Sequence, residues 1–220
     1  LLLRTVKFSS DGTRLAAWEE GGTITVWNVE TGTLIAEVVH PVAVTEGAWS
    51  PDNRLLAAGH GDGTVTFSET RTGAPIVSLR AHADAIYDLA WSPDSTRIAM
   101  SSESDFFVDV WNVASQQKVL GPLRHSHGIT AIAWEPNGQR IASGGMDNAI
   151  KVWDAAAGRE IVTLRGHDYG ITSIAWGPDG RLATAGSDGT MKVWDSLHDQ
   201  EASVLAADRR RATSVAWSPD

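Results

Sequence analysis

The sequence predicts an all-β fold built from one four-stranded unit repeated along the chain, and three markers support this prediction. Aromatic residues recur every 41–43 residues, at Phe8, Trp49, Trp91, Trp134, Trp176 and Trp217. A second series follows the first five of these by 18–20 residues, at Trp27, Ser68, Trp111, Trp153 and Trp194. Nine residues before each tryptophan of the first series stands His40, His82, His125, His167 or Asp208. Three markers that keep one phase across a chain are the signature of a repeat architecture.

Each unit contains four short segments with strand character. In the fourth unit these segments are Ile129–Trp134, Arg140–Gly144, Ala149–Asp154 and Glu160–Arg165. They are rich in Ile, Val, Trp and Thr, which favour strands, and Pro, Asn, Asp and Gly separate them. No stretch has the 3.6-residue apolar period of an amphipathic helix.

A sheet of such short strands cannot cover its two faces alone, and radial stacking of successive sheets solves this problem. We therefore predict a β-propeller with five complete blades, at about 1–40, 41–81, 82–124, 125–166 and 167–207. A sixth blade contributes only its first strand within 208–220. Propellers close with about four to eight blades, so we expect this segment to be part of a larger ring of about seven.

Composition and charge exclude several classes of protein. Hydrophobic residues make up 42% and charged residues 20%, which is typical of a globular domain, and no apolar run is long enough to cross a bilayer. The net charge of −9 argues against nucleic-acid binding, which depends on neutralising phosphates. The chain has no cysteine, which excludes disulfides and thiolate metal sites and is compatible with a cytoplasmic location.

Short motifs carry a resemblance to a known family. Gly166-His167 opens the fifth unit and Trp194-Asp195 closes its third strand, while Trp153-Asp154 stands at the same place in the fourth unit. Trp27-Asn28 and Trp111-Asn112 are near-matches. Over essentially the whole chain these pairs resemble the WD-repeat family, which implies the propeller fold and a role in binding other proteins.

The resemblance also implies a structural hydrogen-bond network in each blade. In that family the loop histidine, a serine or threonine of the second strand, the following aspartate and the tryptophan of the third strand are often linked. Buried polar groups need such partners. The complete sets would be His82, Ser101, Asp105 and Trp111; His125, Ser143, Asp147 and Trp153; and His167, Thr184, Asp188 and Trp194.

The first two units depart from this pattern. Ala58 and Ser68 replace the hydroxyl and the tryptophan in the second unit, and Ala17 and Gly21 replace the hydroxyl and the aspartate in the first. We expect apolar packing and backbone pairing alone to hold these two blades. Their third strands should then be less protected from hydrogen exchange than those of blades three to five.

Neither catalytic nor metal-binding residues are expected. A histidine, a hydroxyl and an aspartate could form a hydrolase triad, but here the trio recurs and is tied to a tryptophan, as in a structural device. His125 and His127 lack a third ligand nearby in sequence for zinc. The Asp-Gly turns lack the ligand spacing of a calcium loop, so no cofactor is expected either.

What remains is the surface formed by the loops that enter the first strand and those that join the second to the third. Aromatic residues and methionine are enriched at binding hot spots, which draws attention to Tyr169, Phe106 and Met146. The candidate partner-binding residues are Tyr169, Asp168, Phe106, Met146, His127, His60, Arg209 and Arg210.

Two functions from different classes follow. The first is a non-catalytic scaffold or sensing module that binds peptides or protein domains on this loop surface, as part of a larger multidomain signalling protein. The second is a propeller enzyme with a central active site, and it is disfavoured because the entry loops offer little chemistry. Those loops carry Pro41, Ala43, Ala83, Ala85, Gly128 and Gly170. If the native ring is not closed, its exposed apolar blade faces would favour self-association.

Overall fold

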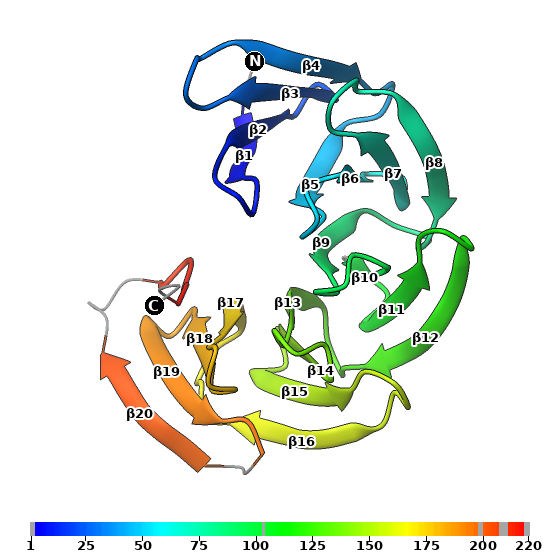
Figure 1. Cartoon of the computed structure of the whole chain (residues 1–220). Helices are drawn as coiled ribbons and strands as arrows, with labels where there is room; N and C mark the ends of the chain where they lie inside the picture. The colour runs from blue at the N-terminus through cyan, green and yellow to red at the C-terminus, as the bar shows by residue number, and fades with distance from the viewer. Residues whose placement is uncertain (1–2, 103, 198–199, 207–210, 218–220) are drawn as a thin grey trace. The chain divides into compact units, whose positions relative to one another are not determined.

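A computed structural model of the chain describes residues 3–102, 104–197, 200–206 and 211–217. Within these residues, twenty strands form five four-stranded sheets, and in each sheet neighbouring strands follow the order of the chain (Figure 1). The described residues contain no helix of the length and apolarity that crossing a membrane requires. The predicted all-β fold of repeated four-stranded units is confirmed.

Each strand of the first two sheets is six residues long. The first sheet contains β1 (Leu3–Phe8), β2 (Arg14–Glu19), β3 (Thr23–Asn28) and β4 (Leu34–Val39). The second contains β5 (Val44–Trp49), β6 (Leu55–His60), β7 (Thr64–Glu69) and β8 (Pro75–Arg80). Both sheets are antiparallel meanders.

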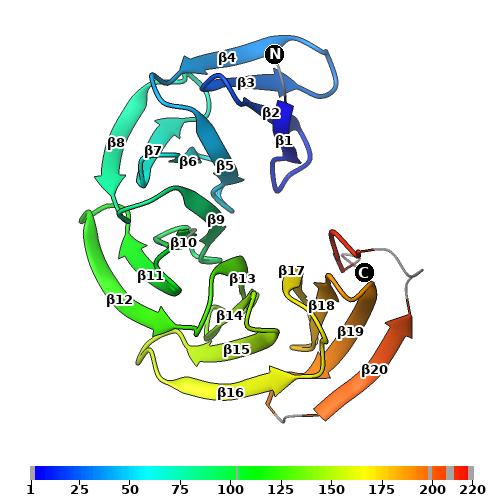
Figure 2. The ribbon, with the colours of Figure 1, turned by 180° about the vertical axis from the view of Figure 1, so that it is seen from behind.

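The remaining three sheets repeat this pattern. The third contains β9 (Ile86–Trp91), β10 (Arg97–Ser102), β11 (Phe107–Asn112) and β12 (Gln117–Arg124). The fourth contains β13 (Ile129–Trp134), β14 (Arg140–Gly145), β15 (Ala149–Asp154) and β16 (Glu160–Arg165). The fifth contains β17 (Ile171–Trp176), β18 (Leu182–Gly186), β19 (Thr190–Asp195) and β20 (Gln200–Ala206). Figure 2 shows the strand order of the fourth and fifth sheets from the other side.

The chain forms two compact units, which are described separately. The first unit comprises Leu1–Asp105 and Asn112–Gln116, and the second comprises Phe106–Trp111 and Gln117–Asp220. The first two sheets therefore belong to the first unit, and the fourth and fifth sheets belong to the second.

Polar turns join the first and second strands of several sheets. In the second sheet the Ser50 hydroxyl donates to Asp52 Oδ1 at 2.6 Å and accepts from the Leu55 amide at 2.9 Å. Asp52 Oδ1 also accepts from the Arg54 amide at 3.0 Å. Short side chains that bond nearby backbone groups favour such turns over continued strand, so the Ser-Pro-Asp sequence fixes the hairpin.

The hydrophobic core lies between successive sheets. In the first unit one buried cluster joins Trp18 and Val26 of the first sheet to Val44 and Leu56 of the second. Trp18 is fully buried, and its ring lies so close to Gly47 that a Cβ there would be 2.1 Å from the indole. A residue with no side chain is therefore required at position 47.

Tryptophans of the first strands link successive sheets by hydrogen bonds to the backbone. Trp49 Nε1 donates to the Lys7 carbonyl at 2.9 Å, and Trp176 Nε1 donates to the Ala133 carbonyl at 3.1 Å. These bonds explain the period of the first tryptophan series. Among the described residues, the buried Trp91 Nε1 has no hydrogen-bond partner.

The first strand predicted for a sixth blade is absent from the described part of that segment. Residues 211–217 have no strand pairing. They lie beside β17, where Trp217 Nε1 donates to the Ala175 carbonyl at 3.0 Å and the Thr172 hydroxyl donates to the Ala212 carbonyl at 2.5 Å. A strand needs a paired neighbour, and no described residue supplies one. The segment nevertheless keeps the tryptophan contact of the complete units.

Candidate interaction surface

The fourth sheet contains a closed hydrogen-bond network beneath its loops. His125 Nδ1 lies 3.0 Å from Asp147 Oδ2, and His125 Nε2 lies 2.8 Å from Ser143 Oγ. Trp153 Nε1 donates to the same Ser143 oxygen at 2.8 Å. The side chain of His125 is fully buried, and Ser143 is fully buried as well. All four residues that the resemblance implied are therefore linked in this sheet.

The fifth sheet has the same network with threonine in place of serine. His167 Nδ1 lies 2.8 Å from Asp188 Oδ2, and His167 Nε2 lies 2.8 Å from Thr184 Oγ1. Trp194 Nε1 donates to Thr184 Oγ1 at 2.8 Å. Thr190 adds two hydrogen bonds to Asp188 Oδ1, from its amide at 2.9 Å and its hydroxyl at 2.7 Å.

One arrangement of protons satisfies every member of these networks. A carboxylate only accepts hydrogen bonds, so the histidine nitrogen that faces it must carry a proton. With Nδ1 protonated, Nε2 of the neutral ring accepts from the hydroxyl, which in turn accepts from the indole N–H. The hydroxyl oxygens of Ser143 and Thr184 are thus fully engaged, and neither residue is exposed. A nucleophile must reach its substrate, whereas both of these hydroxyls are buried and hydrogen-bonded.

The aspartates of these networks stay ionised in acid. Burial raises the pKa of Asp147, but hydrogen bonds from His125 and from the Ser126 amide outweigh burial and hold it well below the usual range. Burial likewise opposes the ionisation of Asp188, but hydrogen bonds from Thr190 and His167 lower its pKa to about 2.

In the third sheet the network implied by the resemblance is wrong by one position. Strand pairing matches Leu89 with Met100, as it matches Ile132 with Ser143 in the fourth sheet. Met100, not Ser101, therefore occupies the hydroxyl position. His82 Nδ1 still lies 2.8 Å from Asp105 Oδ2, but its Nε2 faces the Met100 carbonyl at 3.2 Å. Within the described chain, the buried Ser101 Oγ and Trp111 Nε1 have no hydrogen-bond partner.

The second sheet has polar contacts that the sequence did not predict. The rings of His40 and His60 lie 4.9 Å apart, and His60 Nε2 lies 2.9 Å from Thr66 Oγ1. His40 Nδ1 reaches the same oxygen at 3.5 Å. The expectation that apolar packing and backbone pairing alone hold this sheet is therefore wrong. His60 is only 1% exposed, so it is not a surface residue, and its candidacy for partner binding is withdrawn.

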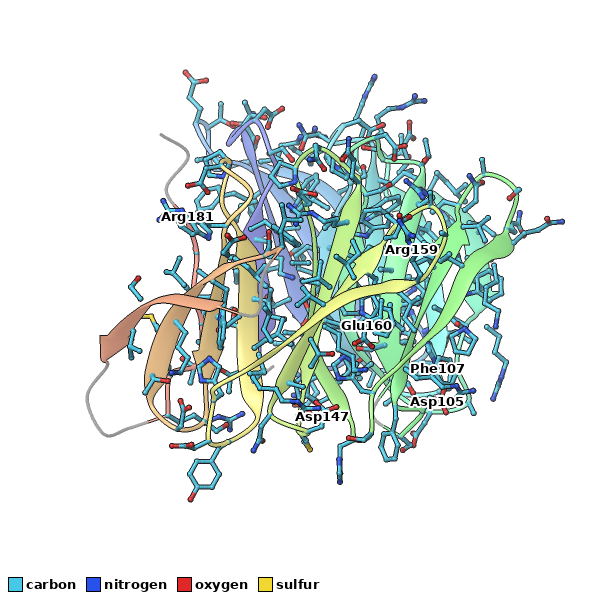
Figure 3. The ribbon with its side chains drawn as sticks, turned by 90° about the horizontal axis from the view of Figure 1, so that it is seen from below. Asp105, Phe107, Asp147, Arg159, Glu160 and Arg181 are labelled. Atoms are coloured by element: carbon cyan, nitrogen blue, oxygen red, sulfur yellow. The ribbon has the colours of Figure 1, made fainter. Side chains whose placement is uncertain are left out.

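The networks also fix the loops that lie above them. Asp147 Oδ2 accepts from the Ser126 amide at 3.2 Å, and Asp188 Oδ2 accepts from the Asp168 amide at 3.0 Å. Each aspartate thus ties the loop that enters its own sheet to the turn between the second and third strands. Figure 3 shows Asp147 at one end of the strands of the second unit, with Arg159 and Arg181 at the opposite end.

Sequence reasoning missed Asn148 as a positioning residue. Its Nδ2 donates to the Asp168 carbonyl at 2.9 Å, which joins the fourth sheet to the loop of the fifth. Asn148 has φ of +61°, where Gly63 and Gly189 have +81° and +79° in the corresponding turns. Asparagine is the residue after glycine that best tolerates this conformation, so its presence in a glycine position was the available signal.

Exposed apolar side chains lie in the loops of the second unit. Phe106 is 42% exposed, Met146 is 61% exposed and Tyr169 is 64% exposed. The rings of Phe106 and His127 are 6.4 Å apart, and Asp168 lies beside Tyr169. We call Phe106, His127, Met146, Asp168 and Tyr169 the loop surface. The other two candidates, Arg209 and Arg210, lie outside the described residues.

The described residues contain no group of three or more His, Cys, Asp or Glu side chains placed to hold a metal ion. The exposed His127 lies near the Ser126 hydroxyl, at 3.2 Å, and near Phe106. The loop surface therefore offers apolar and hydrogen-bonding contacts.

Comparisons with known proteins agree with this architecture. A match to the protein family described as "IFT122 first beta-propeller" spans residues 3–220. The chain is 34% identical over 144 residues to Protein FIZZY-RELATED 1 of Arabidopsis thaliana, which covers 64% of this chain and 30% of that protein. It is 28% identical over 143 residues to APC/C activator protein CDC20 of Saccharomyces cerevisiae, which covers 64% of this chain and 23% of that protein.

A solved structure shows the same fold. The chain superposes on a chain of "Crystal Structure of Mitotic Checkpoint Complex" with a TM-score of 0.89 and 24% sequence identity, over 99% of this chain and 68% of that one. At this identity the likeness establishes the fold alone. The aligned segment spans less than a third of each of the two curated relatives, at 30% and 23% of their lengths.

Proposed function

Because the chain belongs to the WD-repeat β-propeller family described as the first β-propeller of IFT122, we propose that it is a non-catalytic protein-interaction module. Its loop surface would bind a peptide or a domain of another protein. The observation that carries this proposal is the combination of exposed Phe106, Met146 and Tyr169 with loops fixed by buried networks.

Fixed loops favour binding because little conformational entropy is lost when a partner docks. Aromatic residues and methionine bury a large apolar area and are enriched at the centres of interfaces. One relative points the same way, since it is named an activator protein. That name does not identify a partner for this chain.

The alternative of a propeller enzyme has less support. The histidine, hydroxyl and aspartate trios lie in the core, and their hydroxyls are bonded to tryptophan. We propose that the chain has no catalytic activity.

Other features of the native protein stay predictions. They are a ring of about seven blades, membership of a larger signalling protein, a cytoplasmic location and self-association of an unclosed ring. The exclusion of nucleic acid as a partner rests on the net charge of −9.

The test compares one double and one single alanine variant of the full-length protein with the unchanged protein. Met146→Ala with Tyr169→Ala removes the two most exposed apolar side chains of the loop surface, while Ile161→Ala removes an apolar side chain from β16 that is 40% exposed. Quantitative affinity purification from the source cells should show specific partners reduced at least tenfold by the double variant and unchanged by Ile161→Ala. Partner recovery that is equal for all three proteins would contradict the proposed surface.

A further inference from the structure

An arginine at the start of the second strand reaches across to the next sheet. Arg14 of β2 stacks over the Trp49 ring at 5.2 Å. Its Nη1 donates to Thr70 Oγ1 at 2.8 Å, and its Nη2 donates to the Asn53 carbonyl at 3.0 Å. The first and second sheets are thus joined at the strand ends opposite the histidines.

The same contact recurs between the fourth and fifth sheets. Arg140 stacks over the Trp176 ring at 4.8 Å, and its Nη1 donates to Ser196 Oγ at 2.7 Å. Thr70 and Ser196 each stand two residues after the third-strand position of the second tryptophan series. An arginine of one sheet is therefore paired with a hydroxyl residue of the next.

Between the second and third sheets both members of this pair are apolar. Strand pairing matches Leu55 with Glu69, as it matches Arg14 with Asn28. Leu55 thus occupies the arginine position. Val113, two residues after Trp111, occupies the hydroxyl position. The long side chain that fills this space elsewhere is missing here.

A cavity of about 430 Å³ is lined by Leu55 and Val113. Apolar residues of both sheets contribute to its walls. They are Leu55, Ile76, Val77, Val113 and Ala114. Ile76 is 56% exposed, so the cavity is open to solvent, and its size is within the range of about 300–1,000 Å³ seen for ligand pockets.

A second cavity of about 430 Å³ adjoins the first, because Asp52, Arg54, Leu55 and Ile76 line both. It carries the two exposed arginines Arg54 and Arg71. Within the described chain neither guanidinium forms an ion pair with a carboxylate.

The acidic residues of these cavities are already engaged. Asp52 Oδ1 accepts from the Ser50 hydroxyl at 2.6 Å and from the Arg54 amide at 3.0 Å. Glu69 Oε2 accepts from the Thr72 hydroxyl at 2.5 Å. Two unpaired cations on a chain with a net charge of −9 therefore stand beside an apolar cavity.

We propose that the two cavities form one groove, the Leu55 groove, which binds a short segment of a partner protein. The segment carries an aliphatic side chain for the cavity at Leu55 and a carboxylate for Arg54 or Arg71. Two residues of extended chain span about 7 Å, enough to place these two groups in adjoining cavities. The groove shares no residue with the loop surface, so it is a second binding site beyond the proposed function.

The physical basis is a combination of burial and charge pairing. An aliphatic side chain gains free energy by leaving water for the apolar walls. Guanidinium groups bind carboxylates through two parallel hydrogen bonds, which adds orientation to affinity. Neither contact alone would distinguish one partner segment from another.

The experiment uses a displayed library of random heptapeptides, selected on the full-length protein. The counter-selection protein carries Leu55→Arg with Val113→Thr, which rebuilds the pair seen at Arg14 and Thr70 and replaces the apolar wall at Leu55 with a cation. Recovered peptides should share an aliphatic and an acidic residue one to three positions apart. A synthetic peptide from the selection should bind the double variant at least tenfold more weakly.

Two further variants separate the contributions. Arg54→Gln with Arg71→Gln should weaken binding at least threefold, whereas Leu55→Met, which keeps the wall apolar, should change it less than twofold. Thermal unfolding checks that each variant is folded. The proposal is overturned if no peptide is enriched over the double variant, or if enriched peptides lack a carboxylate. Variants of the loop surface should leave peptide binding unchanged, so this test and that of the proposed function fail independently.

Discussion

The second and fourth sheets share one backbone pattern but hold their interiors together differently. In the fourth sheet Ser143 links Trp153 to His125, and His125 links onward to Asp147. In the second sheet the positions of Ser143 and Trp153 are taken by Ala58 and Ser68. Two histidines that share Thr66 replace the network there.

The difference teaches that the backbone pattern does not depend on the network. The fourth sheet satisfies each polar group of the set, while the second leaves His40 Nε2 and Ser68 Oγ buried without a partner among the described residues. An unsatisfied buried polar group costs about 1–3 kcal/mol. The second sheet should therefore open more readily than the fourth, although both fold.

The largest effect on stability is expected when Ser143 of the fourth sheet is replaced by alanine, the residue at the same position in the second sheet (Ala58). Ser143→Ala leaves the Trp153 indole and His125 Nε2 without their shared partner in the core. Two orphaned groups should lower the free energy of unfolding by about 2–4 kcal/mol. Hydrogen exchange of β14 and β15 amides measures this loss locally.

Ser101→Ala in the third sheet is the matched control. Ser101 is also fully buried, but its hydroxyl has no partner within the described chain. Its removal should change the stability by less than about 0.5 kcal/mol, or raise it. Equal losses for the two variants would mean that Ser101, and not Met100, holds the hydroxyl position.

A smaller effect is expected when Arg140 of the fourth sheet is replaced by leucine, the residue at the same position in the second sheet (Leu55). Arg140→Leu removes the ion pair with Glu135, whose side chain is 4% exposed, and the bond to Ser196. A buried carboxylate without its partner should cost about 1–3 kcal/mol, measured by denaturant unfolding. Arg181→Leu, at an arginine whose side chain is 52% exposed, should cost less than about 0.5 kcal/mol. A larger loss at Arg181 than at Arg140 would contradict this ranking.

The smallest effect is a difference between the two sheets in how their stability depends on pH. Burial, and then the charge of neighbouring His60, lowers the pKa of His40 to about 4. The unfolded chain therefore binds a proton more readily than the folded chain, so this contribution is full above about pH 6.5 and is lost as the pH falls toward 4. The pKa values of Asp147 and Asp188 are lowered instead, so their contributions persist until the pH falls below about 4.

Between pH 6.5 and 4.5 the second sheet should thus loosen while the fourth does not. We expect a loss of about 1 kcal/mol in the opening free energy of β6 and β7 amides, measured by hydrogen exchange and corrected for intrinsic rates. His40→Gln should remove most of the pH dependence. A loss of the same size in β14 and β15 would show that the histidine pair is not its source.

The sequence predicted the repeated features because they are local or periodic. Tryptophan spacing located the first and third strands, and Pro, Asn, Asp and Gly located the turns between strands. The networks of the fourth and fifth sheets follow the same spacing. The network predicted for the third sheet was wrong because Ser101 lies beside Met100, and a shift of one residue turns a side chain to the opposite face of the sheet.

Other features depend on contacts between sheets, which spacing alone does not contain. His60 looked like an exposed loop residue, yet pairing with Val44 continues β6 through it and buries it. Leu55 and Val113 do not stand out in the sequence, because only the structure shows that they occupy the positions of an arginine and a hydroxyl residue that are paired elsewhere. That pair joins positions 56 residues apart in the other sheets.

The tryptophan bonds between first strands have a consequence for how such a chain can evolve. The donor is a side chain at a fixed place in each unit, but the acceptor is a backbone carbonyl, as at Lys7, Ala133 and Ala175. Every residue type provides a carbonyl, so this bond places no demand on the residue type of the preceding unit. It can therefore persist when a unit is duplicated or exchanged, whereas the contact of Trp18 with Gly47 needs a matching glycine in the next unit. Beside Trp91 no such bond forms among the described residues.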